Sequence, residues 1–188
     1  MGENGSEMEK KEPEFIFYHE QQELQMCLKH ALNNLLQRPA YTKELLNDYC
    51  LHLDDRNWFN PHRSMLGLGN YDVNVLMLAL SSVEEDLTLV WFDSRLKYKN
   101  VNNEKVFGYI FNKPNTGLLS LITRGRHWFT VLPIDDGRHY NLDSKLARPE
   151  RIMDFPEFFN DHLAKGGEIL IATKFEHDGV IKKPTEGI

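Results

Sequence analysis

Residues 127–143 read HWFTVLPIDDGRHYNLD and predict two antiparallel strands joined by a tight turn. If the loop consists of residues 135–137, Asp143 faces Phe129 and lies diagonally opposite His127 on one face of the sheet. A two-residue turn would place Asp143 and His127 on opposite faces, because a one-residue slip inverts the pattern. We expect the three-residue loop, with Gly137 at positive φ in a bulge.

Around this hairpin the sequence divides into a helical half and a strand-rich half. Apolar residues spaced three and four apart predict helices over 24–36, 42–53 and 73–80, the second with Thr42 as its N-cap. Short runs rich in β-branched and aromatic residues predict further strands over 87–92, 106–111 and 168–174, with a helix over 154–165 before the last. Helices followed by an antiparallel sheet predict an α+β fold.

Composition limits the kind of protein this is. The chain has 188 residues, of which 41% are hydrophobic and 27% charged, as expected for one globular domain with its own core. We predict this domain over 15–177, a disordered tail over 1–14 and a second tail over 178–188. The net charge of −6 argues against nucleic acid as the main partner.

The same composition bears on the cellular compartment. Two cysteines cannot build a disulfide framework and indicate a reducing environment. The polar first 14 residues lack the apolar core of a secretory signal, and no apolar run is long enough to cross a bilayer. We therefore expect the protein in the cytoplasm or nucleus, as a monomer without membrane association. Met1-Gly2 and Ser6 formally match a myristoylation pattern, but the acidic surroundings argue against it.

Cys27 is the candidate nucleophile. A lone cysteine is more often a small apolar core residue, but Cys27 lies in the first turn of a predicted helix. The partial positive charge of a helix N-terminus stabilises the thiolate, which is the nucleophilic form. Cys50 lies well inside its helix on the apolar face, so we interpret it as a core residue.

A cysteine nucleophile needs a base, and the base needs an orienting acceptor. His127 begins a predicted strand beside the bulky Trp128, and the register described above brings Asp143 within its reach. An oxyanion needs donors, for which the backbone N–H of Cys27 and the side-chain amide of Gln21 or Gln22 are available. This order of amide, Cys, His and Asp follows the logic of papain-like thiol hydrolases.

Three blocks of the sequence resemble the Josephin family of deubiquitinating cysteine proteases, especially its short members. They are YHEQQELQMCLKHALNNLLQ (18–37), NPHRSMLGLGNYDVNVLMLAL (60–80) and RHWFTV with YNLDSKL (126–146). The resemblance covers roughly residues 15–174. It implies a papain-like fold, ubiquitin and its conjugates as partners, and hydrolysis of the bond after the C-terminal glycine of ubiquitin.

By position, the resemblance implies a role for each site residue. Cys27 matches the nucleophile, His127 the general base, and Asp143 the residue that orients the histidine. Gln22 matches the oxyanion-hole glutamine, which decides between it and Gln21. No metal or organic cofactor is implied. Leu28 departs from the family pattern, which usually has a smaller residue there.

Two other function classes remain open. The chain could be a non-catalytic ubiquitin-binding module, or another papain-type thiol hydrolase acting on a different acyl group. Beside Cys27, His30 has no second pair of metal ligands, so we interpret His30, Asn33 and Asn34 as structural. The glycines of 67–69 lack the pattern of a phosphate-binding loop.

Overall fold

The fold is taken from a computed structural model that describes residues 15–23, 26–54, 71–83, 86–114, 126–174 and 179–182. The predicted tail over 1–14, the end of the second tail and the glycines of 67–69 lie outside the described residues. None of the helices in these ranges has the length and apolar character needed to cross a bilayer.

Four α-helices and six strands make up the described regular structure, with two short 3-10 turns, η1 and η2. In chain order the elements are α1 (Cys27–Leu36), α2 (Lys43–Leu53), α3 (Val73–Val83), β1 (Thr88–Trp91), η1 (Tyr98–Asn100), η2 (Asn103–Lys105), β2 (Gly108–Pro114), β3 (Arg126–Pro133), β4 (His139–Asn141), β5 (Glu150–Ile152), α5 (Phe155–Ala164) and β6 (Glu168–Thr173).

Most predicted elements are confirmed, with shifted ends. Thr42 caps α2 by accepting a hydrogen bond from the N–H of Leu45, as predicted. β4 ends at Asn141, earlier than predicted, and the Asn141 side chain accepts the N–H of Asp143 directly after the strand. The helix predicted from residue 24 begins at Cys27. β5 was not predicted from the sequence.

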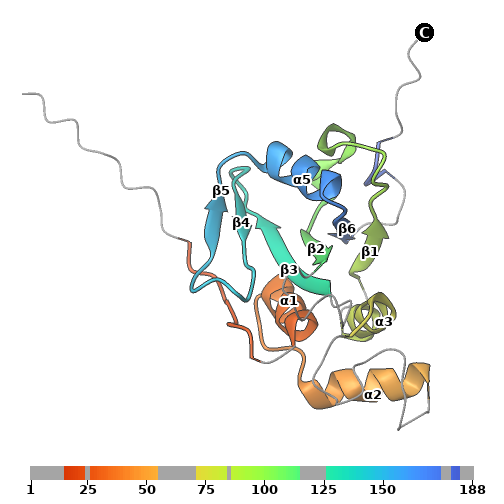
Figure 1. The fold of residues 1–188 in the computed structure, drawn as a ribbon. Coiled ribbons are helices and arrows are strands. Elements are labelled where there is room, and N and C mark those ends of the chain that lie inside the picture. Colours follow the sequence, from red (N-terminus) through yellow and green to blue (C-terminus); the bar gives the residue numbers. More distant parts are fainter. Residues whose placement is uncertain are drawn as a thin grey trace, which may run out of the picture.

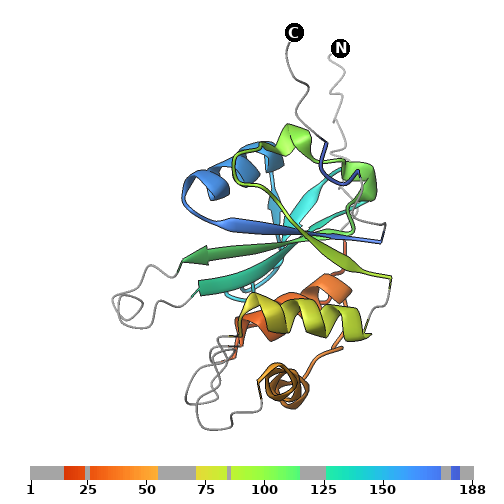
Figure 2. The same ribbon diagram turned by 90° about the vertical axis from the view of Figure 1, so that its right-hand side faces the viewer.

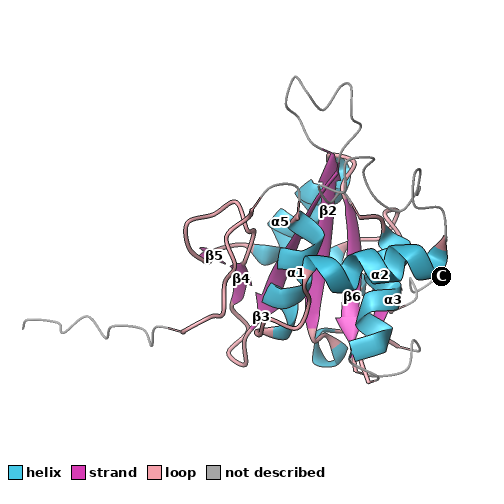
Figure 3. Cartoon of the chain, turned by 90° about the horizontal axis from the view of Figure 1, so that it is seen from below, coloured by secondary structure: helices cyan, strands magenta, loops and turns pink. Residues whose placement is uncertain are grey.

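The strands form one antiparallel sheet in the order β1-β6-β2-β3-β4-β5. Figure 1 shows the strands, and Figure 2 shows α5 on one side of the sheet with α1 and α3 on the other. α2 lies beyond α1 and α3, and in Figure 3 these three helices lie in front of the strands. The predicted α+β fold is therefore confirmed.

Side chains of β3 alternate between the two faces of the sheet. Trp128 and Leu132 belong to the core beneath α1 and α3, whereas Phe129 and Val131 belong to the aromatic core beneath α5. This alternation follows from the period of two in a β-strand. His127 lies in register with the α5 side of the strand, and its ring stacks on Phe129 with a centroid separation of 6.1 Å.

The β3–β4 turn has the predicted three-residue loop. Val131 pairs with Asn141 and Pro133 with His139, the register expected for a loop of 135–137. Gly137 has φ of +83°, a region that favours glycine because it has no Cβ. The turn therefore sets the register on which the position of Asp143 relative to His127 depends.

Candidate active site

Cys27 is the first residue of α1 and packs against β3. Thr130 fixes the helix by donating its hydroxyl hydrogen to the carbonyl oxygen of Ala31 at 2.6 Å. Cys27 is only 4% exposed, and its Sγ atom lies 3.9 Å from the carbonyl oxygen of Arg126. The thiol therefore lies beside the backbone of β3, at the residue that directly precedes His127.

The prediction that the helix N-terminus gives Cys27 thiolate character is wrong for this arrangement. Burial raises the pKa of the Cys27 thiol above its ordinary 9.0, because desolvation penalises the charged form. The backbone of Trp128 and the charge of Lys145 oppose this effect without overcoming it. The thiol is therefore the resting form.

His127 and Asp143 form the contact predicted from the turn register. The Nε2 atom of His127 lies 2.6 Å from Oδ1 of Asp143, and the two residues are 1% and 4% exposed. An ionised carboxylate only accepts hydrogen bonds, so the proton lies on Nε2 and Nδ1 keeps its lone pair. Such a tautomer can accept a proton from a thiol.

The protonation states of this pair follow from burial and from each other. Burial lowers the pKa of His127, and the neighbouring Asp143 opposes that shift. Burial alone would raise the pKa of Asp143, but hydrogen bonds from His127 and from the backbone of Lys145 contribute to lowering it to about 2. Near neutral pH the site therefore holds a neutral imidazole and an ionised carboxylate.

Gln22 is tied to the segment that carries Asp143. Its N–H donates to the carbonyl oxygen of Ser144 at 2.7 Å, and its Oε1 lies 3.4 Å from the Ser144 hydroxyl. Gln21 is exposed and donates its amide to the carbonyl oxygen of Ala147. Both glutamines line an open pocket of about 470 Å³. The oxyanion role of Gln22 stays a prediction.

His30, Asn33 and Asn34, which we interpret as structural residues, connect α1 to the segment that precedes it. The Nδ1 atom of His30 lies 2.6 Å from Oε2 of Glu20, and Asn33 donates to the other oxygen of Glu20 at 2.9 Å. Asn34 accepts the N–H of Glu20 and donates to the carbonyl oxygen of Leu142. These bonds hold the chain that carries Gln22 against both the helix and the end of β4.

Cys50 is fully buried in the core, as predicted. His, Cys, Asp and Glu side chains in the described ranges form no group of three or more suited to a metal ion.

Sequence reasoning missed two contacts to Asp143. The Nζ atom of Lys113 lies 3.3 Å from its Oδ2, and Nε2 of His19 lies 3.1 Å from its carbonyl oxygen. Lys113 faces His127 in the β2–β3 register. That register was not predicted, because the long connection over 115–125 does not fix it. Nothing in the sequence marked His19 as a residue of the site, apart from its place in the first of the three blocks that resemble the Josephin family.

Comparison with known proteins agrees with this architecture. The family model named Josephin matches residues 22–173. Josephin-2 of Homo sapiens is 46% identical over 140 residues, which cover 73% of each chain. A Josephin-like protein of Drosophila melanogaster is 41% identical over 169 residues, covering 86% of this chain and 75% of the relative.

A more distant relative extends the comparison. An Ataxin-3 homolog of Caenorhabditis elegans is 28% identical over 156 residues, which cover 78% of this chain and 45% of the relative. The chain therefore belongs to the Josephin family, known as deubiquitinating enzymes.

Proposed function

We propose that this protein is a deubiquitinating cysteine protease that cleaves the bond after the C-terminal glycine of ubiquitin. The observation that carries the proposal is the buried 2.6 Å contact between His127 and Asp143, with the Cys27 thiol against the same strand. Family membership supports the reaction class, and the site supplies a nucleophile, a base and an orienting carboxylate.

The first chemical step is attack on the glycine carbonyl. Because burial favours the thiol form of Cys27, the proton leaves as the bond forms rather than beforehand. Nδ1 of His127 takes that proton and the sulfur bonds to the carbonyl carbon. The Gln22 amide and the Cys27 N–H donate to the resulting oxyanion.

The later steps return the enzyme to its starting form. The imidazolium of His127 gives its proton to the leaving amine as the carbon–nitrogen bond breaks, which leaves a thioester on Cys27. His127 then removes a proton from water, which attacks the thioester. As the carbon–sulfur bond breaks, the imidazolium gives that proton to the Cys27 sulfur, and ubiquitin leaves with a free C-terminal carboxylate. Asp143 keeps the ring in the tautomer that both steps need.

The described resting geometry lacks one contact that these chemical steps require. His127 hydrogen-bonds Asp143 and not Cys27 among the residues that the structure describes. Catalytic hydrogen bonds are often long or unformed before substrate binds. We propose that ubiquitin binding brings Nδ1 and Sγ together by a local side-chain adjustment.

A ubiquitin probe with a C-terminal electrophile tests the proposal. The wild-type protein should form a covalent adduct, and Cys27→Ala should not. Cys50→Ala is the matched control, because it removes the other cysteine and leaves the candidate nucleophile in place. Adduct formation by the control but not by Cys27→Ala would assign the reactive sulfur.

Two results would redirect the proposal. Ubiquitin binding without labelling of the wild-type protein would point to a non-catalytic binding module. Labelling by a different ubiquitin-like probe, but not by ubiquitin, would point to a papain-type hydrolase for another acyl group.

A further inference from the structure

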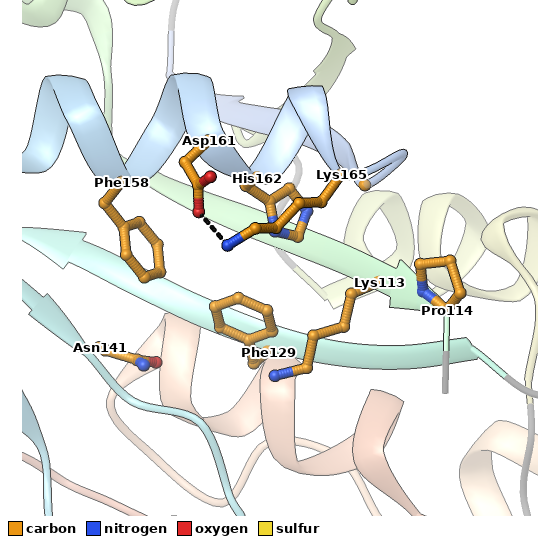
Figure 4. A pocket seen from close by; sticks show the side chains of 9 residues that line it. Lys113, Pro114, Phe129, Asn141, Phe158, Asp161, His162 and Lys165 are labelled. Atoms are coloured by element: carbon orange, nitrogen blue, oxygen red, sulfur yellow. Dashed lines mark hydrogen bonds and ion pairs between the residues drawn. The ribbon is translucent and has the colours of Figure 1, made fainter. Parts of the chain in front are cut away.

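A pocket of about 350 Å³ lies between the ends of β2 and β3 and the C-terminal part of α5. Figure 4 shows Phe129 and Lys113 from the sheet on one side, and Phe158 of α5 with Lys165 directly after that helix on the other. This pocket is on the face of the sheet shared by His127 and Phe129. It therefore adjoins the candidate site from the side opposite α1.

Lys113 links the pocket to the site. Its ammonium lies 3.3 Å from Oδ2 of Asp143 and 4.8 Å from the centre of the Phe129 ring. The Asp143 side chain is 6% exposed, whereas that of Lys113 is 44% exposed. The half-exposed Lys113 ammonium thus contacts Oδ2 of the buried Asp143 carboxylate, which is the oxygen that does not contact His127.

Both oxygens of Asp143 are therefore engaged, each by a different element. Oδ1 contacts His127 and accepts the N–H of Lys145 at 3.0 Å, and Oδ2 contacts Lys113. A carboxylate held at both oxygens has little freedom to turn about its last bond. Its orientation determines which ring nitrogen of His127 carries the proton.

Several charged or titratable groups surround His127. They are Lys113 on β2, Arg126 on its own strand, Asp143 and Lys145 after β4, Cys27 on α1, and, across the pocket, Asp161 and His162 on α5 with Lys165 directly after that helix. Asp161 pairs with Lys165 at 2.6 Å, and His162 donates to backbone carbonyl oxygens. Lys113 is thus the cation that both contacts Asp143 and lies opposite His127.

We propose that Lys113 is a positioning residue of this site, which orients Asp143 and keeps His127 in its neutral form. This inference rests on the proposed function for its catalytic meaning. A cation close to an imidazole disfavours the imidazolium, and a cation on the carboxylate weakens the attraction of that carboxylate for the imidazolium. Both effects favour a His127 ready to accept a proton from Cys27.

The test compares Lys113→Met with the wild-type protein by NMR titration of the His127 ring. Methionine removes the charge and keeps an unbranched side chain for contact with Phe129. The His127 titration should move to higher pH in Lys113→Met and return towards wild type in Lys113→Arg. Lys165→Met is the matched control, because it removes a cation from the same pocket that is paired with Asp161, and it should leave the titration unchanged.

Hydrolysis of ubiquitin carrying a fluorescent C-terminal leaving group supplies the second readout. In Lys113→Met, kcat/KM at about pH 5.5 relative to about pH 7.5 should fall by about threefold or more, because more His127 is protonated. A purely structural role would lower both values by the same factor. That result, or an unmoved His127 titration, would overturn the proposal.

The two readouts separate this inference from the proposed function. The NMR titration needs no turnover, so a shift in Lys113→Met would stand even if no ubiquitin substrate were cleaved. An active wild-type enzyme with an unmoved titration would instead remove the role of Lys113 alone.

Discussion

Two buried histidines lie 2.6 Å from a carboxylate oxygen, His30 against Glu20 and His127 against Asp143. Burial lowers the pKa of both. They differ at the second ring nitrogen. Nε2 of His30 accepts the N–H of Glu23 at 3.1 Å, whereas the described contacts of His127 leave Nδ1 without a hydrogen-bond partner.

This difference separates a structural histidine from a candidate base. His30 uses one nitrogen as a donor and the other as an acceptor, so a further proton would displace a backbone hydrogen bond. His127 has a nitrogen available to take a proton. A short His–carboxylate contact therefore does not identify a catalytic base, and the remaining nitrogen has to be considered as well.

Replacing His127 gives the largest expected effect on this comparison. His127→Gln keeps a polar side chain but has no group able to take up the thiol proton. We expect kcat/KM for ubiquitin cleavage to fall by about 10²–10⁴-fold. Steady-state kinetics with a fluorescent ubiquitin substrate would measure it, and activity near that of the wild type would remove His127 from its role.

The matched variant is His30→Gln. It disrupts a buried hydrogen-bonded pair, so we expect the free energy of unfolding to fall by about 1–3 kcal/mol. Activity per folded molecule should remain well above that of His127→Gln. Denaturant unfolding combined with the same kinetic assay tests both, and equal loss of activity in the two variants would remove the distinction.

Asp143→Asn sharpens the comparison at the carboxylate. The amide oxygen can still accept from Nε2 of His127, but the amide N–H₂ then faces the Lys113 ammonium. We expect kcat/KM to fall by about tenfold to hundredfold, less than for His127→Gln. Asp143→Ala, which removes the acceptor, should lose more activity than Asp143→Asn; the reverse order would contradict an orienting role.

The two cysteines allow a test of the nucleophile without substrate. Because burial raises the pKa of the Cys27 thiol, its alkylation by iodoacetamide should accelerate as the pH rises beyond the ordinary thiol value of 9.0. Cys50, which is fully buried in the core, should react only on unfolding. Mass spectrometry of the modified sites measures both rates, and rapid alkylation of Cys27 near pH 6 would contradict the thiol resting form.

A smaller effect is expected on stability as a function of pH. The pKa values of His30 and His127 in the folded state lie below their ordinary 6.5. As the pH falls, these two imidazoles therefore take up protons in the unfolded state at a higher pH than in the folded state. Their contribution to stability is complete above about pH 6.5 and is lost as the pH falls below that value. Tm should therefore fall between pH 7 and pH 5, and a rising Tm would contradict the assignment.

The sequence predicted the part of the site that depends on local chemistry. The turn at Gly137 fixed the strand register, and the register brought Asp143 to His127. The thiolate expectation failed, since local helix position favours the charged form of Cys27 while burial depends on how α1 packs against β3. Packing of that kind has no signature within one short stretch.

Pairing between distant parts of the chain explains why the sequence did not predict the role of Lys113 or the strand β5. Lys113 reaches Asp143 only because β2 pairs with β3 across a connection whose length does not fix the register. β5 has only three residues, and its central residue, Arg151, pairs with Tyr140 of β4 in the antiparallel register. A run this short lacks the alternation from which strands are predicted.

The position of β6 in the sheet has a consequence for biosynthesis. β6 lies between β1 and β2, although it follows every other strand in the chain. A ribosome therefore releases β1 and β2 with unpaired edges, which are prone to aggregation until residues 168–173 emerge. Cys27 likewise emerges long before Asp143, so a nascent chain carries the candidate nucleophile without its partner residues and should be inert towards ubiquitin conjugates.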